Sequence, residues 1–267
     1  MYSNIYIYTM ATKATDIDLT LFQIGRLEDS STVSSQKIAW INYETNKRKL
    51  HIQTPVFVTE TYGIPREGTY YQTDKSRAFY KLAFCHERAK NSDEVDYTAM
   101  EQFYKKLAEI DQHFGSEEFK LTLFGDKLAS KYEYQPIVRH PEREDEEEEA
   151  DDKTSTRTIR EYYRPPYTKV KLMLSNNENE LPLFRLIDRN DDGTKEEIQL
   201  NSFSDATKHM RYMTKHRMII EVQKLYAMKT NSGGDKRKYG ITVKLVAAEC
   251  THRAEITNNR CIDLFDD

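Results

Sequence analysis

Two adjacent prolines, Pro165 and Pro166, precede the segment that most restricts how this chain can fold. Each proline fixes its own φ angle and removes a backbone donor, so the chain enters this segment extended and not helical. Polar and apolar residues then alternate over residues 168–174, which is typical of a strand with one buried face. Lys169 and Lys171 share the other face. The buried face would carry Val170, Leu172 and Leu174.

Aromatic and basic side chains gather just before this predicted strand. They are Tyr162, Tyr163, Arg164 and Tyr167. Cationic groups beside aromatic rings suit a polyanion with flat bases. The same residues would also serve the edge of an ordinary β-domain, so this cluster by itself leaves both readings open.

An acidic run precedes the aromatic cluster. Residues 142–152 hold nine carboxylates and one arginine, a net charge of −8. Because the whole chain carries −4, the remainder carries +4 and is mildly basic. We predict a solvated, disordered loop at 141–160 and a short acidic tail at 262–267. The tail residues Asp263, Leu264 and Phe265 could mimic a nucleic-acid strand or dock on partner proteins; a frayed terminus is the alternative.

Length and composition indicate one polar but foldable chain. Its 267 residues suffice for one large β-rich domain or two smaller ones. No apolar run approaches the roughly 20 residues that span a bilayer, so we expect no membrane partner. The three cysteines are odd in number and far apart, which predicts a reducing, intracellular location and neither a disulfide framework nor a zinc site.

The pattern along the chain predicts an N-terminal extension, 1–36, with a strand near 16–22, followed by one domain, 37–267. Strands at 37–43 and 49–54 are expected to form a hairpin, and 120–125 and 132–138 to be extended. Residues 96–115 have helical spacing, and a short helix is predicted at 205–216. Residues 181–187 and 198–203 should pair across a turn, and 218–228 and 239–250 are strongly β. This indicates a mainly β or α+β fold.

Motifs for catalysis are missing from the sequence. There is no glycine-rich phosphate loop, no serine-hydrolase elbow and no His-Glu-x-x-His pattern. The segment Asp188–Gly193 resembles the start of a calcium loop, but Gln199 replaces the final glutamate, and we predict a hairpin turn instead. The sequence therefore predicts no enzyme, no cofactor and no metal site.

The remaining possibility is a binding function, which is indicated by basic residues that are interleaved with aromatic ones. Single-strand binders need cations along the phosphates and rings that stack on bases. For any one residue there is an alternative to nucleic-acid binding: tyrosines also fill the cores of β-domains, and lysines at sheet edges prevent pairing with other chains. The candidate nucleic-acid-binding residues are Lys47, Arg48, Lys49, Arg66, Tyr71, Arg77, Tyr80, Lys81, Tyr163, Arg164, Tyr167, Lys169, Lys171, Lys208, Arg211, Lys215, Lys236, Arg237 and Lys238.

The order of short motifs resembles a family of single-stranded DNA-binding proteins from nucleocytoplasmic large DNA viruses. The motifs are Ile52-Gln-Thr-Pro, Tyr62-Gly-Ile, Leu121-Thr-Leu-Phe-Gly, Tyr134-Gln-Pro-Ile-Val, Pro165-Pro-Tyr-Thr-Lys-Val-Lys-Leu and Lys238-Tyr-Gly-Ile-Thr-Val-Lys-Leu. The similarity runs from about Ile38 to Cys250. It departs from the family at Leu123-Phe124-Gly125, where such proteins often have a tryptophan, and in the N-terminal extension.

The resemblance implies an elaborated OB-like β-barrel, which we expect to carry one long and one short helix. It also implies sequence-independent binding of single-stranded DNA, or RNA, in viral DNA replication, repair or recombination. The expected location is the host cytoplasm or nucleus at viral replication sites, or the virion. Replication proteins would be partners through the acidic tail. The alternative is a virion structural or scaffold protein that uses sheet edges and a tyrosine-rich surface for protein contacts.

Overall fold

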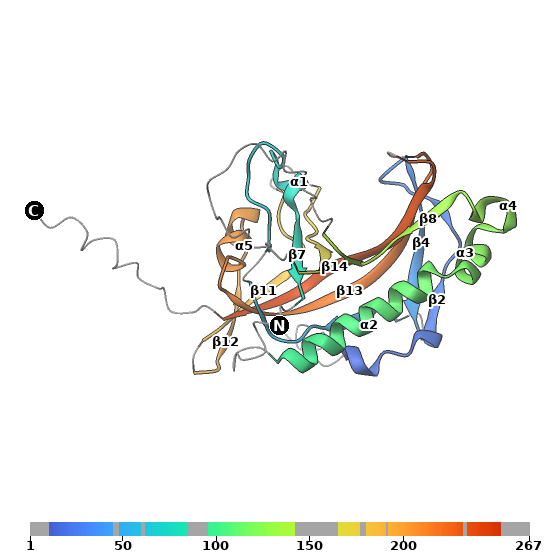
Figure 1. Cartoon of the computed structure of the whole chain (residues 1–267). Coiled ribbons are helices and arrows are strands. Elements are labelled where there is room, and N and C mark those ends of the chain that lie inside the picture. The colour runs from blue at the N-terminus through green and yellow to red at the C-terminus, as the bar shows by residue number, and fades with distance from the viewer. Residues whose placement is uncertain are drawn as a thin grey trace, which may run out of the picture.

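Two long antiparallel strands form the centre of the molecule (Figure 1). The computed structural model describes residues 11–44, 48–59, 62–84, 96–141, 165–176, 180–190, 192–231 and 234–251. Strand β13 (Lys215–Met228) pairs with β14 (Arg237–Thr251) along almost its whole length, with two irregularities in register. The two strongly β segments predicted from the sequence are confirmed.

The other described strands extend this pair into one mixed sheet. Its main path runs β1 (Thr12–Lys13), β5 (Leu50–Gln53), β13, β14, β10 (Tyr167–Lys171) and β7 (Phe79–Ala83). Off this path lie β2 (Phe22–Ile24), β3 (Glu28–Asp29), β4 (Gln36–Tyr43), β6 (Phe57–Val58), β8 (Tyr132–Gln135), β9 (Val138–Arg139), β11 (Arg185–Arg189) and β12 (Lys195–Ile198). The mainly β or α+β class is confirmed, and the sheet path is open between β1 and β7.

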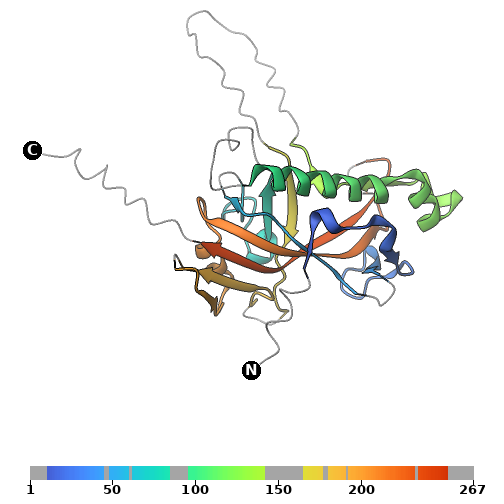
Figure 2. The ribbon, with the colours of Figure 1, turned by 90° about the horizontal axis from the view of Figure 1, so that it is seen from below.

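Helix α2 (Tyr97–Gly115) covers one side of this sheet (Figures 1 and 2). Asp96 begins it, since its carboxylate accepts a hydrogen bond from the Ala99 amide at 2.9 Å. The predicted apolar stripe is buried in the same core as β13, β14 and β10; it consists of Met100, Phe103, Leu107, Ile110 and Phe114. The long helix predicted at 96–115 is confirmed. In the described ranges no helix is long and apolar enough to cross a membrane.

The prediction of one long and one short helix is wrong, because further helices occur. Residues 120–125, expected to be extended, belong to α3 (Glu117–Phe124). Ser116 caps it by accepting from the Phe119 amide, and Gly125, at φ 73°, ends it. These caps outweigh the short β-like alternation. The other described helices are α1 (Asp74–Arg77), α4 (Asp126–Ala129), α5 (Phe203–His209) and the 3-10 turns η2 (Ala14–Asp16) and η3 (Leu19–Leu21).

The hairpin expected at 37–54 is also wrong. Strands β4 and β5 both run antiparallel to β13 and lie one after the other along its edge. Between the two strands, an isolated antiparallel bridge pairs Tyr43 with Arg48. The 14 residues of β13 are enough to pair with both strands, which the local pattern could not indicate.

The predicted N-terminal extension belongs to the sheet from residue 11 onward. Strand β1 pairs with β5, and β2 and β3 pair with β4. Ala14 and Ile17 are buried in the common core. The predicted boundary at residue 36 is therefore wrong for the described part, and the strand expected at 16–22 is replaced by 3-10 turns before β2.

The hairpin predicted around residues 181–203 is confirmed as β11 and β12. Asp192 in its turn accepts a hydrogen bond from the Thr194 amide at 2.8 Å. The short helix α5 that follows is about half the predicted length. It ends before Met213, whose φ of 64° turns the chain into β13.

Candidate nucleic-acid interface

Basic side chains gather on the side of the sheet that faces away from α2. In β10, Val170 and Leu172 are buried in the core, whereas Lys169 and Lys171 are exposed, as predicted. Directly paired residues lie on the same face of a sheet. Lys171 pairs with Lys244 of β14, and Lys169 pairs with Lys81 of β7. We call this surface the cationic face; it consists of Lys81, Arg139, Lys169, Lys171, Lys224 and Lys244.

The cations on this face are close enough to perturb one another. Burial lowers the pKa of Lys169, and the charges of Arg139, Lys81 and Lys171 lower it further. Burial also lowers the pKa of Lys224, and Lys171 adds to that effect. Crowded like charges favour the binding of an anion, because its charge relieves their repulsion.

Aromatic rings flank the cationic face at its β7–β10 end. The Lys81 ammonium lies 5.0 Å from the ring centre of Tyr167 and 5.4 Å from that of Tyr62. These two rings are 5.0 Å apart. The Lys169 ammonium lies 3.8 Å from the ring centre of Phe79. A cation above a ring face is attracted by the ring quadrupole, so these contacts hold the ammonium groups over the sheet.

Trp40 lies at the opposite end of the cationic face. It pairs with Lys224, whose ammonium is 5.7 Å from the indole ring centre, and 52% of Trp40 is exposed. From β4 to β7 the sheet crosses four strand spacings, or roughly 19 Å at about 4.8 Å each. A row of cations therefore lies between exposed Trp40 at one end and the half-buried rings of Tyr62 and Tyr167 at the other.

One buried carboxylate, Glu221, organises the β5 margin of this face. Its carboxylate lies 3.2 Å from Lys244, 3.3 Å from His51 and 3.8 Å from Lys49, and its side chain is only 4% exposed. Burial favours a higher pKa for Glu221, but the hydrogen bond from His51 and the charges of Lys244 and Lys49 outweigh it and hold the pKa below its usual value. Glu221 is thus ionised and orients Lys244.

Three residues predicted from the sequence belong to the cationic face, namely Lys81, Lys169 and Lys171, and a fourth, Tyr167, flanks it. Lys49 lies at its margin through Glu221, and Tyr71 adjoins it, with its ring 5.6 Å from that of Phe79.

Tyr80 is a clear correction, because it is 1% exposed and cannot stack on a base. Its hydroxyl is 2.5 Å from the Thr59 hydroxyl, and its ring packs against Phe57 and His216. Burial raises its pKa. Period-two alternation places Tyr80 opposite Lys81, on the core side of β7.

Other predicted residues have structural partners away from this face. Arg77 pairs with Asp74 at 2.8 Å and lies over the Phe203 ring. Arg48 lies 3.9 Å from Glu44, Lys208 pairs with Asp205, Lys238 with Glu133, and Arg237 lies over Tyr132.

The remaining predicted residues either have no contact that links them to the cationic face among the interactions described above, or lie outside the described residues. Lys215 is nine residues from Lys224 along β13, or roughly 30 Å. Arg211 near it, Arg66 in the loop before α1 and Lys236 before β14 are exposed. Outside the described residues lie Lys47, Tyr163, Arg164, the loop at 142–160 and the tail residues Asp263, Leu264 and Phe265.

Sequence reasoning missed half of the cationic face. Lys244 stands between Val243 and Leu245, and Lys224 precedes Leu225, in two segments already recognised as strands, so the face of the strand that each occupies could have been read from the sequence. Their closeness to Lys171 depends on strand order and register. Nothing in the sequence around Trp40 or Arg139 indicated that these residues lie at the same face. The other missed neighbours are Tyr62, His51 and Glu221.

A second buried carboxylate, Glu249, balances three cations near the β11–β12 hairpin. Lys195, Arg217 and Arg189 lie 2.7, 2.9 and 3.2 Å from it. Burial favours a higher pKa for Glu249, but hydrogen bonds from Lys195 and Arg217 outweigh it, so the pKa lies below the usual 4.5. A carboxyl with a lowered folded-state pKa stabilises the fold above its unfolded-state pKa and loses that contribution as the pH falls.

We therefore expect Glu249→Gln to lower the free energy of unfolding by about 2 kcal/mol at neutral pH. The difference from the unchanged protein should shrink as the pH drops below 4.5, the ordinary pKa of this group. Urea unfolding at several pH values measures it. Glu196→Gln on exposed β12 is the matched control. A deficit that stays constant down to acid pH would contradict this assignment.

In the described part of the chain, no three His, Cys, Asp or Glu residues are placed to hold a metal ion. His216 and Cys250 are in contact, with Nδ1 3.3 Å from Sγ, but both are buried. Burial raises the pKa of the Cys250 thiol, which opposes formation of a nucleophilic thiolate.

No family model matches the chain. The chain is 28% identical over 232 residues to an uncharacterized protein, R505, of Acanthamoeba polyphaga mimivirus. The match covers 80% of this chain and 55% of that protein, so the chain spans about half the length of this relative.

Proposed function

We propose that this chain binds single-stranded nucleic acid, without regard to sequence, on the cationic face. The observation that carries the proposal is the crowding of like charges on one side of a sheet between exposed or half-buried aromatic rings. Lysines and arginines neutralise phosphates and release counterions, and aromatic faces stack on unpaired bases. Trp40 at one end and Tyr62 with Tyr167 at the other supply rings for such stacking.

The setting of this activity is viral DNA replication, repair or recombination. The mimivirus relative supports a viral setting, and the mixed sheet with its bent long strands (Figure 1) is compatible with an elaborated OB-like core. The acidic segment 142–152 and the tail compete with nucleic acid or recruit replication proteins in this proposal. RNA is an alternative ligand, because stacking and phosphate contacts do not distinguish it from DNA.

A structural or scaffold role has less support. Strands that recruit other chains through their edges are long, flat and apolar. The edge strand β12 is short and carries Lys195, Glu196 and Glu197, which discourages such pairing.

Titration with a thymidine oligomer of about 20 nucleotides tests the proposal, since one OB fold covers roughly 4–16 nucleotides. Trp40 is the single tryptophan of the chain, so its fluorescence reports on one end of the cationic face. We expect quenching on binding and a log–log salt slope of about −3.5 to −4.2 for five or six phosphate contacts. A uridine oligomer of equal length tests RNA.

Absence of binding at low salt would contradict the proposal if it persists after deletion of residues 142–152 and of the last five residues. The deletion distinguishes a cationic face that is blocked by the acidic segments from one that does not bind nucleic acid at all. Such a result would favour the structural role.

A further inference from the structure

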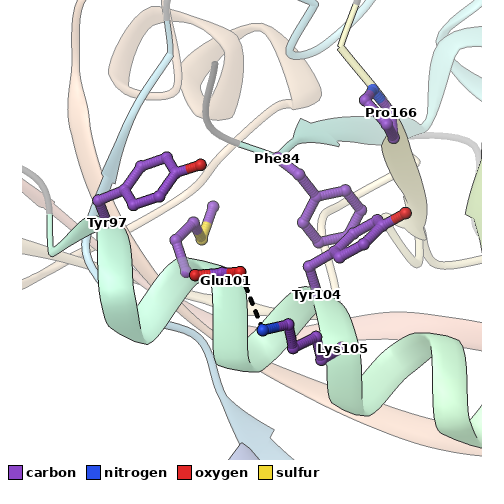
Figure 3. Close-up of a pocket in the computed structure, with 7 residues that line it drawn as sticks. Phe84, Tyr97, Glu101, Tyr104, Lys105 and Pro166 are labelled. Carbon is purple, nitrogen blue, oxygen red and sulfur yellow. Dashed lines mark ion pairs between the residues drawn. The ribbon is translucent and has the colours of Figure 1, made fainter. Parts of the chain in front are cut away.

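A pocket of about 270 Å³ lies on the α2 side of the sheet, at the end where β7 stops and β10 begins (Figure 3). Five residues of α2 line it at helical spacing: Tyr97, Met100, Glu101, Tyr104 and Lys105. Phe84 and Pro166 form the opposite wall. The cationic face does not include any of these side chains.

The pocket nevertheless adjoins the aromatic end of the cationic face. Phe84 follows Ala83, Pro166 precedes Tyr167, and Ala83 pairs with Tyr167. The Phe84 amide donates to the Pro166 carbonyl at 2.9 Å. Side chains alternate between the faces of a strand, so the pocket lies one residue beyond Tyr167 on the other side. A nucleic-acid strand that rounds this end of the sheet passes from Tyr167 to the pocket.

The chemistry of the lining matches one planar base. The Phe84 and Tyr104 rings meet edge to face with centres 5.0 Å apart, and Tyr97 adds a third ring to the lining. Glu101 and Lys105 form an ion pair at 2.9 Å, which places an acceptor beside a donor. Pockets for drug-sized ligands measure about 300–1,000 Å³, so this smaller one suits a single ring system.

Guanine complements this donor–acceptor pair best. Its Watson–Crick edge offers two adjacent N–H donors, which one carboxylate accepts together, beside the O6 acceptor for an ammonium group. Thymine offers one N–H donor between two carbonyl oxygens, so the carboxylate accepts one hydrogen bond from it instead of two. We propose that the pocket binds an unpaired guanine base, with Glu101 accepting from N1–H and N2–H and Lys105 donating to O6. For a base within a strand, this inference rests on the proposed function of the cationic face.

The test compares a thymidine oligomer of about 20 nucleotides with the same oligomer carrying one central deoxyguanosine. We expect the single guanine to tighten binding about tenfold, within the range of a bidentate base contact. Glu101→Gln should abolish this preference and leave binding of the thymidine oligomer unchanged. Glu109→Gln is the matched control, because Glu109 also pairs with a lysine of α2 but lies outside the pocket. Tyr104→Leu keeps the apolar packing and removes the ring face.

Titration with the free mononucleotides dGMP and dTMP separates the two sources of a guanine base. Binding of dGMP that is lost in Glu101→Gln, without any oligomer binding, would keep the pocket and refute the cationic face. Equal affinity for both oligomers together with no binding of dGMP would overturn the guanine pocket and leave the cationic face standing. A guanine preference that survives both Glu101→Gln and Tyr104→Leu would also overturn it.

Discussion

Replacing Lys169 and Lys171 together with glutamate is expected to weaken binding of a thymidine oligomer about 100-fold at low salt, or about 2.7 kcal/mol. Both side chains are exposed on β10 at the centre of the cationic face, beside Lys81 and Lys244. The change removes two phosphate contacts and adds two negative charges. The magnitude of the salt slope should fall by about 1.4 in fluorescence titrations, at about 0.7 per lost contact with a single strand.

The matched control reverses Lys127 and Lys131, two exposed lysines in and after α4. It changes the net charge of the chain by the same amount, so it measures the effect of overall charge. We expect it to alter affinity less than threefold, which is the size of an ordinary surface effect of about 0.5 kcal/mol. Equal losses in both double variants would show that net charge, and not the cationic face, drives binding.

Asp111→Ala is expected to lower the free energy of unfolding by about 3–4 kcal/mol. One carboxylate oxygen of Asp111 accepts from the Tyr134 hydroxyl at 2.8 Å and the Ile137 amide at 2.7 Å. The other oxygen accepts from the Val138 amide at 2.9 Å. Burial raises the pKa of Asp111, although these hydrogen bonds oppose the shift. Burying the carboxylate therefore costs free energy, and removing it costs more because its three donors lose their acceptor. Alanine would leave the amides of Ile137 and Val138, both in buried residues, without this acceptor.

This contact also links stability to the site, because Val138 is followed by Arg139 of the cationic face. We therefore expect Asp111→Ala to weaken nucleic-acid binding as well, measured on protein that is still folded at low temperature. Glu118→Ala, an exposed acid on α3, is the control and should stay within about 0.5 kcal/mol of the unchanged protein in urea unfolding. A loss below about 1 kcal/mol for Asp111→Ala would contradict this role.

The local sequence pattern was sufficient to predict the helices and strands whose apolar residues recur with strong periodicity. Helix α2 and strands β10, β13 and β14 follow from apolar spacing that a single segment already shows. It failed at residues 117–124, where Leu121, Leu123 and Phe124 alternate like a strand but the caps at Ser116 and Gly125 select a helix. It failed again at 37–54, since two strands end to end and two strands in a hairpin have the same local pattern.

In the candidate site, too, some features follow from the sequence and others only from the tertiary structure. From the sequence alone, Lys169 and Lys171 were placed opposite a buried apolar face, because side chains alternate along one strand. The tertiary structure alone decided that Lys224, Lys244 and Arg139 join them, since β13, β14 and β9 reach β10 from distant parts of the chain. It also moved Tyr80 into the core and brought Trp40 to the far end. Sequence determines which face of a strand a residue occupies, whereas strand order and register determine its neighbours, and these depend on contacts between segments far apart in the chain.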